Sequence, residues 1–325
     1  MSTATSVPET YELEGDDALR TLRRTGWGQL AKDSFQRFRA ADGFSHARAL
    51  AYQVTLTLLP AVIAAVGLAT AVRASRFRQL IVQAVDRLAP GPAGQLITEA
   101  VEQGAKSASR GGVVALVIGA LAALGSATLA MGQIERGANR IYGVERDRPT
   151  AQKYWNGFLL ACSAGVLVVL AFVLIVAGSD VARATELSGV VRGLWTVLRW
   201  PLSIGFAVVA FAVLFREAPR RRQPSWSWLA VGSGLSVLLW FLFTGLLALY
   251  LNGSSGALGR TYGPLTGMIA VLIWSFLTSL AIYLGLAFAA QLEAVRAGVP
   301  APKTEEQANP AGPDGSRRRS RLAWR

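Results

Sequence analysis

Cysteine and histidine are almost absent from this sequence. Its 325 residues include one of each, Cys162 and His46. A single cysteine cannot form a disulfide within the chain, and clusters of cysteine or histidine ligands around a metal ion are excluded as well. A serine–histidine–carboxylate triad would have to use His46, and no nucleophile-elbow, phosphate-binding or dinucleotide-binding motif accompanies it. We therefore predict no catalytic residue, no metal and no cofactor, and we expect that the protein is not an enzyme.

Charged residues are also scarce, and they are unevenly distributed. They make up 16% of the chain, where soluble domains carry about 25%. Six long windows contain no Asp, Glu, Lys, Arg or His. A helix needs about 20 apolar residues to cross the hydrocarbon core of a bilayer, and five of the six windows reach that length. The sequence therefore predicts an all-α, polytopic integral membrane protein with six transmembrane helices.

The fourth span needs an extension to reach the required length. Its charge-free part covers residues 200–215. Extending the helix back to Leu194 makes it long enough, because the long side chain of Arg199 can snorkel toward the interface. The predicted spans cover residues 49–72, 111–134, 157–179, 194–215, 228–251 and 265–290.

Positive charge predicts how these spans are oriented. The chain has 33 Lys and Arg residues and a formal net charge of +13. Twenty-three of them lie in the two terminal segments and in the second and fourth connections, and 10 lie in the other three connections. Cytoplasmic segments carry the excess of Lys and Arg, so we predict that both termini are cytoplasmic. The same rule explains the positive charge without nucleic acid, which we do not expect as a partner.

Composition divides the chain into three parts. A polar N-terminal tail covers residues 1–26, the membrane domain covers 27–298, and a basic tail covers 299–325. The basic tail is rich in Pro, Ala, Glu and Arg and has no apolar periodicity, so we predict that it is disordered.

Short amphipathic helices are predicted on both faces of the membrane. Residues 27–38 place apolar side chains at helical spacing among basic ones, which fits a helix on the inner leaflet or one packed on protein. Residues 73–110 predict two short amphipathic helices joined by a turn at Pro90-Gly91-Pro92. Together these two helices form an outer cap, which is either a structural lid or a cover for a cavity or a partner site.

Neutral polar residues mark one face of the first span. Gln53 and Thr57 are four residues apart, and Pro60 frees a backbone carbonyl just beyond them. These groups either line a cavity or form hydrogen bonds to a neighbouring helix. Tyr52 and Tyr262 complete the set of candidate cavity-lining residues.

The second span carries a ridge of small residues. One small residue recurs every four positions, which lets another helix approach closely. We interpret the ridge as a helix-packing surface, either within the chain or between chains. Its members are Gly111, Ala115, Gly119, Ala123 and Ala127.

Four segments of the sequence together match a known family. Residues 48–60, RALAYQVTLTLLP, look like its first helix, and residues 137–144, GANRIYGV, look like the stretch after its second span. Pro219 with the tryptophans that follow looks like a later connection, and residues 262–265, YGPL, lead into a similar sixth helix. Over roughly residues 35–297 the chain thus resembles the YihY/virulence factor BrkB family of bacterial inner-membrane proteins. The resemblance implies a six-span, multi-pass protein of the bacterial cytoplasmic membrane, linked to the cell envelope and to virulence.

The resemblance adds one candidate site and one departure. It singles out Asn139 and Arg140, in the turn after the second span, as a candidate functional loop. The family often has Gly-Ala-Glu-Leu in its last helix where this chain has residues 285–288, so Ala287 replaces a glutamate. The family was once labelled a tRNA-processing ribonuclease, and the residue inventory above argues against that role.

Two hypotheses for function remain. A bundle without buried charge in its spans, with polar helix faces and an outer cap, suits a permease or lipid-handling protein, whose partners are membrane lipids. The alternative is a non-transporting envelope scaffold, which would use the small-residue ridge and the outer helices to bind a second copy or other envelope proteins.

Overall fold

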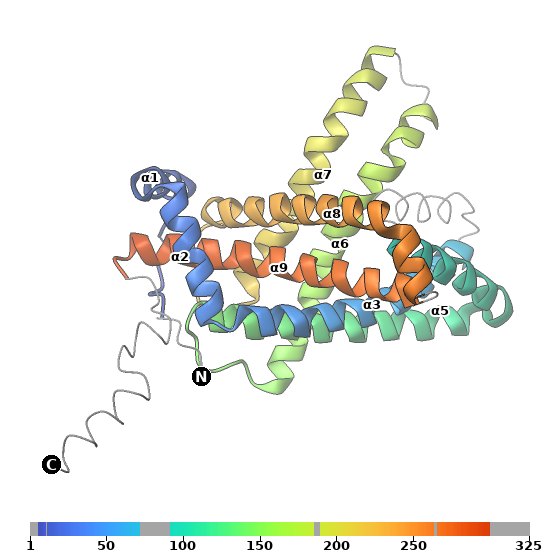
Figure 1. Cartoon of the computed structure of the whole chain (residues 1–325), viewed down its shortest axis with the longest axis horizontal. Coiled ribbons are helices and arrows are strands. Elements are labelled where there is room, and N and C mark those ends of the chain that lie inside the picture. The colour runs from blue at the N-terminus through green and yellow to red at the C-terminus, as the bar shows by residue number, and fades with distance from the viewer. Residues whose placement is uncertain (1–5, 11, 72–91, 185–188, 263–264, 300–325) are drawn as a thin grey trace, which may run out of the picture.

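The described part of the chain is entirely helical. The computed structural model describes residues 6–10, 12–71, 92–184, 189–262 and 265–299, and every regular element among them is an α-helix (Figure 1). The all-α prediction is confirmed for these residues. The helices are α1 (Gly15–Thr25), α2 (Trp27–Ala40), α3 (Gly43–Ala71), α5 (Pro92–Ile141), α6 (Thr150–Ala184), α7 (Gly189–Glu217), α8 (Trp226–Tyr262) and α9 (Leu265–Arg296).

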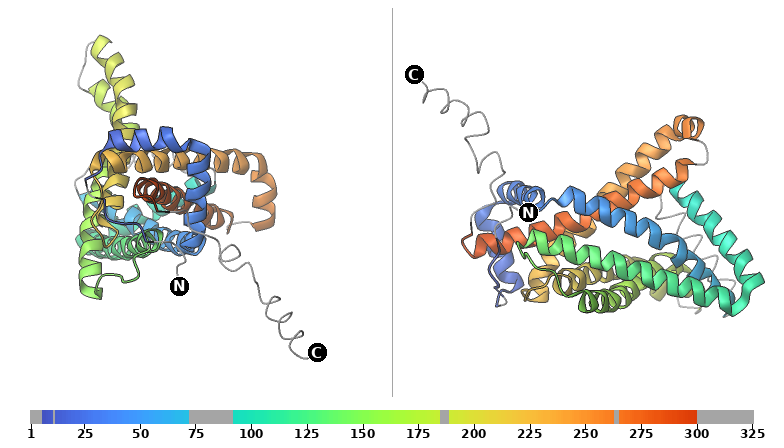
Figure 2. Two further views of the ribbon diagram at one scale, coloured as in Figure 1. Left: turned by 90° about the vertical axis from the view of Figure 1, so that its left-hand side faces the viewer. Right: turned by 90° about the horizontal axis from the view of Figure 1, so that it is seen from below.

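The six long helices are arranged as three antiparallel pairs. The most extensive contacts are those of α3 with α5, α6 with α7 and α8 with α9. The pairs come together at one end of the molecule, and α1 and α2 lie across that end (Figures 1 and 2). We call it the capped end. Toward the opposite end the pairs diverge, and the α6–α7 pair stands away from the other four helices (Figure 1).

Side chains are buried at the capped end and exposed at the diverging end. In α9, every residue from 279 to 294 except Leu284 is buried, and this half of the helix lies at the capped end. In the far half of α7, residues 191–205, nearly every described residue is exposed, and the three that are not are Trp195, Arg199 and Ser203. These three are spaced four apart, so they form a single stripe on one face of α7. Among the described residues, the side chains on the other faces of this half of α7 are exposed.

Within the described residues, five helices have the length and hydropathy of membrane spans. Half of the residues in the α9 span are buried inside the protein, against 22–28% in the other four, whose remaining apolar surface suits lipid. The span in α7 includes the backward extension to Leu194. The first predicted span, 49–72, is helical through Ala71 within α3, but it is not one of the five, so the count of six stays a prediction. The five windows are Val117–Ile141, Thr150–Ala171, Gly193–Glu217, Trp226–Gly253 and Leu265–Arg296.

The first part of α5 differs from the predicted outer cap. Residues 92–110 are not a separate short helix, because they belong to the same 50-residue helix as the second span. Figures 1 and 2 show this part (teal) bent away from the rest of α5 and reaching α9. A Cβ atom on Gly267 of α9 would lie 3.0 Å from Leu96 Cβ, so the two backbones are close here. Packing on α9 supports the helical segment at the diverging end. The rest of the predicted cap, residues 73–91, lies outside the described part.

Two glycines bring α8 and α9 into backbone contact. A Cβ atom on Gly285 would lie 2.7 Å from the carbonyl oxygen of Gly232, and a Cβ atom on Gly232 would lie 2.9 Å from that of Gly285. The side chain of Ser236 fills the remaining space beside Gly285. Small residues permit such close crossings, which supply van der Waals contact between helices in a membrane.

We expect Gly285→Ala to destabilise the protein by about 1–3 kcal/mol, because the added methyl group would press on the backbone of α8. Gly234→Ala is the matched control, since a Cβ atom at Gly234 would meet nothing within 4 Å. Thermal unfolding of the two variants in the same detergent compares them. Equal midpoints for Gly285→Ala and the parent protein would contradict the close crossing.

Candidate functional site

A group of buried charged and polar side chains lies at the capped end. We call it the capped-end charge cluster, and it consists of Arg37, Tyr142, Arg221, Gln291 and Glu293. The Glu293 carboxylate is fully buried, and Arg221 pairs with both of its oxygens at 2.7 and 3.3 Å. Such a two-pronged pair combines charge with fixed geometry. The Glu293 carboxylate thus lies near two guanidinium groups, those of Arg221 and Arg37.

Arg37 connects α2 to this cluster. Its side chain is fully buried. Its Nε atom donates a hydrogen bond to Gln291 Oε1 at 2.7 Å, and its Nη1 atom donates one to the carbonyl oxygen of Ile141 at 3.2 Å. Burial lowers the pKa of Arg37 to about 10, so the group stays protonated near neutral pH. Arg37 therefore ties α2 to the ends of α5 and α9.

Tyr142 forms one wall of the cluster. The guanidinium carbon of Arg221 lies 4.5 Å from the centre of its ring, which is a cation–π contact. Burial, followed by the nearby Glu293 charge, raises the pKa of Tyr142 well above its usual range. The hydroxyl group therefore stays protonated and neutral, and it adds no negative charge to the cluster.

The polar N-terminal segment is docked onto the same end. Thr10 donates hydrogen bonds from its amide and its hydroxyl to Glu293 Oε1, across 283 residues of sequence. Arg221 donates to the carbonyl oxygen of Pro8 at 3.0 Å. At the start of α8, Ser225 Oγ donates to the carbonyl oxygen of Leu13 at 2.7 Å. The segment predicted only as a polar tail thus forms α1 and helps to cover the capped end.

The sequence predicted that residues 27–38 form a helix lying either on the inner leaflet or on protein, and the position of α2 distinguishes these alternatives in part. Leu30, Arg37 and Phe38 on one face are fully buried against protein. Trp27 and Phe35 remain largely exposed, although the Trp27 ring stacks on Phe288 with 5.9 Å between centroids. One face of α2 therefore packs on the protein, and its exposed aromatic rings remain available to an interface.

The candidate loop residues Asn139 and Arg140 hold backbone in place. Asn139 is fully buried, and its Oδ1 atom accepts a hydrogen bond from the Arg220 amide at 2.7 Å. Its Nδ2 atom donates to Asp147 Oδ1 at 2.9 Å. Arg140 donates from Nη1 to the carbonyl oxygen of Glu145 at 2.9 Å. Both side chains thus brace the two loops beside them.

The Asp147 carboxylate is held in its charged form. Burial alone would raise its pKa, but the Asn139 hydrogen bond and the charge of Lys153 outweigh that effect and lower the pKa below its usual range. Lys153 Nζ lies 3.2 Å from Asp147 Oδ2. Asp147 is therefore an ion-paired structural carboxylate at neutral pH.

Arg148 fixes the end of α7. Its guanidinium group pairs with the buried Glu135 at 3.1 Å. It also donates hydrogen bonds to the carbonyl oxygens of Glu217, Ala218 and Pro219, at 3.2, 2.7 and 3.1 Å. Carbonyl groups at a helix C-terminus have no partner within the helix and attract cations. The connection from α7 to α8 is therefore anchored at its first residues.

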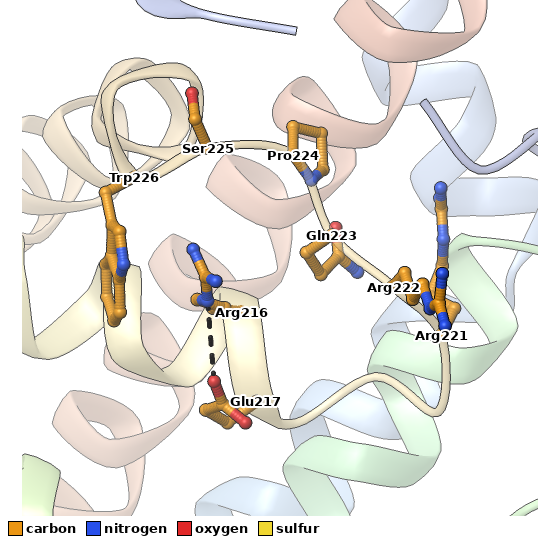
Figure 3. Close-up of a pocket in the computed structure, with 8 residues that line it drawn as sticks. All are labelled: Arg216, Glu217, Arg221, Arg222, Gln223, Pro224, Ser225 and Trp226. Atoms are coloured by element: carbon orange, nitrogen blue, oxygen red, sulfur yellow. Dashed lines mark ion pairs between the residues drawn. The ribbon is translucent and has the colours of Figure 1, made fainter. Parts of the chain in front are cut away.

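A cavity of about 550 Å³ lies beside this connection. It is lined by residues 216, 217 and 221–226 (Figure 3). The guanidinium carbon of Arg216 lies 4.7 Å from the centre of the Trp226 ring, and Arg216 Nε lies 3.5 Å from Glu217 Oε1. Three arginines, one glutamate and one glutamine thus face a space between the ends of two membrane spans.

The candidate cavity-lining residues of the first span are placed as follows. Tyr52 is 58% exposed, and Gln53, Thr57 and Pro60 are partly buried in α3. The Thr57 hydroxyl donates to the carbonyl oxygen of Gln53 within the helix. Tyr262 ends α8, and its side chain lies outside the description. A cavity beside these residues stays a prediction.

The small-residue ridge lies on α5, which packs along α3. Gly119 is buried, and Ala123 and Ala127 are partly buried. The surroundings of Gly111 and Ala115 are not part of the description. Next to Ala127, the backbone of α6 comes close, since a Cβ atom on Gly157 would lie 2.9 Å from the Thr128 carbonyl oxygen. Whether the ridge also binds a second chain stays a prediction.

The position of the missing family glutamate is apolar here. Ala287 is fully buried in α9. Gln291, one turn further along α9, is the hydrogen-bond partner of Arg37. In this chain, Arg37 thus binds the amide of Gln291 near the end of α9.

Sequence reasoning missed the residues that form this site. The sequence places Arg37 only among the basic residues of the amphipathic stretch 27–38 and Arg221 only in the basic connection between the fourth and fifth spans, and it does not point to Gln291 or Glu293. Each lies near a helix end, where a charge normally faces water. The one sequence signal for this cluster was that charged residues accumulate near the ends of several spans.

We expect Glu293→Gln to reduce the free energy of unfolding by about 3 kcal/mol, because it leaves Arg221 buried without its counter-charge. The double variant with Arg221→Met should recover part of that loss. Chemical unfolding in detergent measures both. Arg20→Gln is the control, because the Arg20 side chain is 67% exposed. A Glu293→Gln protein as stable as its parent would overturn the role given to this pair.

The lone histidine makes the stability depend on pH. Burial lowers the pKa of His46, although the nearby Asp42 charge opposes the shift. The unfolded chain, with a histidine pKa of about 6.5, then binds the proton more readily than the folded one. The thermal midpoint should therefore be constant above about pH 6.5 and fall as the pH drops below it. His46→Gln should remove this fall, and an unchanged pH profile in that variant would contradict the assignment.

Comparison with known proteins agrees with the arrangement of apolar helices. The family model described as Virulence factor BrkB matches residues 34–310. The ribonuclease-like protein YfkH of Bacillus subtilis (strain 168) is 27% identical over 258 residues, which cover 78% of this chain and 91% of that protein. No solved structure matches the chain.

A second relative is named as a membrane protein. The UPF0761 membrane protein Mpe_A1422 of Methylibium petroleiphilum is 30% identical over 278 residues, which cover 83% of this chain and 64% of that protein. The chain therefore spans less than two thirds of this relative's length. With a family model matching most of its length and five apolar helices long enough to cross a bilayer, the chain belongs to the Virulence factor BrkB family and is a multi-pass membrane protein.

Proposed function

We propose that this protein handles lipids or similar amphipathic molecules as a permease of the bacterial cytoplasmic membrane, with its capped end in the cytoplasm. The observation that carries the proposal is the one-sided divergence of the three helix pairs (Figure 1). A route for an amphipathic molecule needs lateral access from the bilayer together with a barrier at one end. In this proposal the capped end is the barrier, and the diverging end gives access from the bilayer.

The barrier is the capped end. Glu293 is paired there with Arg221 and with Thr10 of the N-terminal segment, and we infer that this packed end blocks the passage of water and cargo. The α8–α9 crossing at Gly232 and Gly285 is tight on the same side. Net positive charge near this end favours the cytoplasm.

Lateral access is offered by the α6–α7 pair. In its far half, apolar side chains such as Val169, Leu194 and Val197 are 55–70% exposed. In a bilayer, acyl chains occupy the surface that protein leaves uncovered. We therefore infer that lipid acyl chains contact the protein along this exposed apolar surface of the α6–α7 pair.

Arg199 offers a contact for an anionic headgroup. It lies within the α7 span, on the stripe formed with Trp195 and Ser203. Its Nε and Nη1 atoms are buried and have no hydrogen-bond partner among the residues of the described ranges. A charge inside a span is costly unless it is paired, and it often marks a substrate path. A phosphate group is a suitable partner for a guanidinium group.

A scrambling assay tests the proposal. The purified protein is reconstituted into vesicles with fluorescent phosphatidylglycerol, and the fraction accessible to an external quencher is followed over time. We expect faster exchange between leaflets than in vesicles holding an equal amount of an unrelated membrane protein, and slower exchange for Arg199→Gln. Rates equal to the control in every case would overturn the proposal and favour the envelope scaffold.

We do not propose a nuclease activity, although one relative carries a ribonuclease-like name. His46 is the only histidine in the sequence. Its Nδ1 atom lies 3.3 Å from Gln133 Nε2, and its ring lies next to Tyr283, whose hydroxyl group donates to the Gln133 carbonyl oxygen. In the part of the chain that the structure describes, no three His, Cys, Asp or Glu side chains are placed to hold a metal ion.

A further inference from the structure

The cavity beside the α7–α8 connection has the chemistry of an anion site. We propose that it binds the phosphate group of a phosphate-bearing molecule, either the headgroup of an anionic lipid or a free phosphate compound. The site lies at the capped end, away from the exposed half of α7 that contains Arg199 (Figure 1). The inference therefore goes beyond the proposed function and does not depend on it.

The charge of the cavity wall is positive. Arg216, Arg221 and Arg222 line it together with a single carboxylate, that of Glu217 (Figure 3). Arg221 is already paired with Glu293, which lies outside the lining. The Arg216 side chain is 35% exposed and Glu217 is 53% exposed, and their contact is 3.5 Å long. Such an exposed pair is weak, so a phosphate can replace Glu217 as the partner of Arg216.

Gln223 is the second observation that points to a ligand. The residue is 8% exposed and lines the cavity. Its amide interacts with the neighbouring Tyr142 hydroxyl, but neither its Nε2 nor its Oε1 atom has a partner in hydrogen-bonding geometry within the described ranges. A buried amide without a partner costs free energy. Two amide N–H donors beside arginines are well suited to phosphate oxygens.

The N-terminus of α8 also favours an anion in this cavity. The cavity reaches Ser225 and Trp226, where this 37-residue helix begins. Amide groups at a helix N-terminus point outward and carry partial positive charge, which favours a phosphate. This effect adds to that of Arg216 and Gln223 and does not define the site by itself.

The position and size of the cavity fit a headgroup at the membrane interface. The α7 span ends at Glu217 and the α8 span begins at Trp226, so the cavity lies between the ends of two spans. Trp226 is 46% exposed, and tryptophan side chains favour the headgroup layer. A volume of about 550 Å³ lies in the range of small-molecule sites.

Binding to the purified full chain in a neutral detergent tests the proposal. The probes are inorganic phosphate, water-soluble dihexanoyl phosphatidylglycerol and, for comparison, inorganic sulfate. Titration calorimetry should give saturable binding of at least one phosphate probe. Arg216→Gln and Gln223→Glu should each weaken it by at least about tenfold, the first by removing a cation and the second by adding a repelling carboxylate.

The controls separate binding from folding. Arg20→Gln removes an exposed arginine of α1 and should leave binding unchanged. Thermal unfolding of each variant shows that it is folded, and Arg216→Lys keeps the charge if Arg216→Gln does not fold. No saturable binding of either phosphate probe, or equal binding by the parent protein and both cavity variants, would overturn the proposal.

The same titrations identify the source of the phosphate. Binding of dihexanoyl phosphatidylglycerol at least about tenfold tighter than inorganic phosphate would assign the site to a lipid headgroup. Equal affinities would assign it to a free phosphate compound. Scrambling measured on the same preparations is a separate result. Phosphate binding without scrambling would refute the proposed function alone, and scrambling without phosphate binding would refute this site alone.

Discussion

The capped end depends on the buried ion pair between Glu293 and Arg221. Two charges removed from water cost more than their attraction returns unless further hydrogen bonds complete the arrangement. Here Thr10 donates a hydrogen bond to Glu293, and the Tyr142 ring lies against Arg221. The pair and these two partners come from the N-terminal segment, the turn after α5, α9 and the α7–α8 connection, so the pair connects segments that are distant in sequence.

The two ends of the molecule are stabilised by different interactions. At the capped end, Glu293 is paired with Arg221, Arg37 is hydrogen-bonded to Gln291, and nearly all of α9 from residue 279 to 294 is buried. At the diverging end, the α6–α7 pair holds together through a narrow stripe and otherwise faces the space that lipid fills. Stability is therefore concentrated at one end, and motion of the helix pairs is expected at the other. A tight crossing at Gly232 and Gly285 near the stable end gives the α8–α9 pair a fixed point.

The spans could be predicted from the sequence because backbone groups in lipid must bond within their own helix. The same rule supported the extension of the fourth span to Leu194. Periodicity also predicted a helix at residues 27–38, but it could not show which protein surface covers Leu30 and Phe38. The motif located Asn139, yet its partner Arg220 is 81 residues away, and no local pattern connects them.

The missed residues share one physical reason. Glu293 and Arg37 occur among other charges near helix ends, where sequence alone implies contact with water. Their burial depends on which distant segment covers them, and this is a tertiary property. Gln223 lies in a short connection without periodicity, so its unpartnered amide could only be found in three dimensions. For Gly111 and Ala115 the structure adds no surroundings, and the predicted role of the ridge is unchanged.

The docking of Thr10 on Glu293 also determines the order in which this protein can be completed during synthesis. Helices made early, including α2 with Arg37, leave the ribosome long before α9, and the two contacting residues are 283 positions apart. Local pairs such as α3 with α5 can form as soon as both are made, whereas closure of the capped end has to wait for the last helix. A chain interrupted before α9 would present Arg37 and Arg221 without their carboxylate. The N-terminal helices can therefore reach their final position only after α9 has been made.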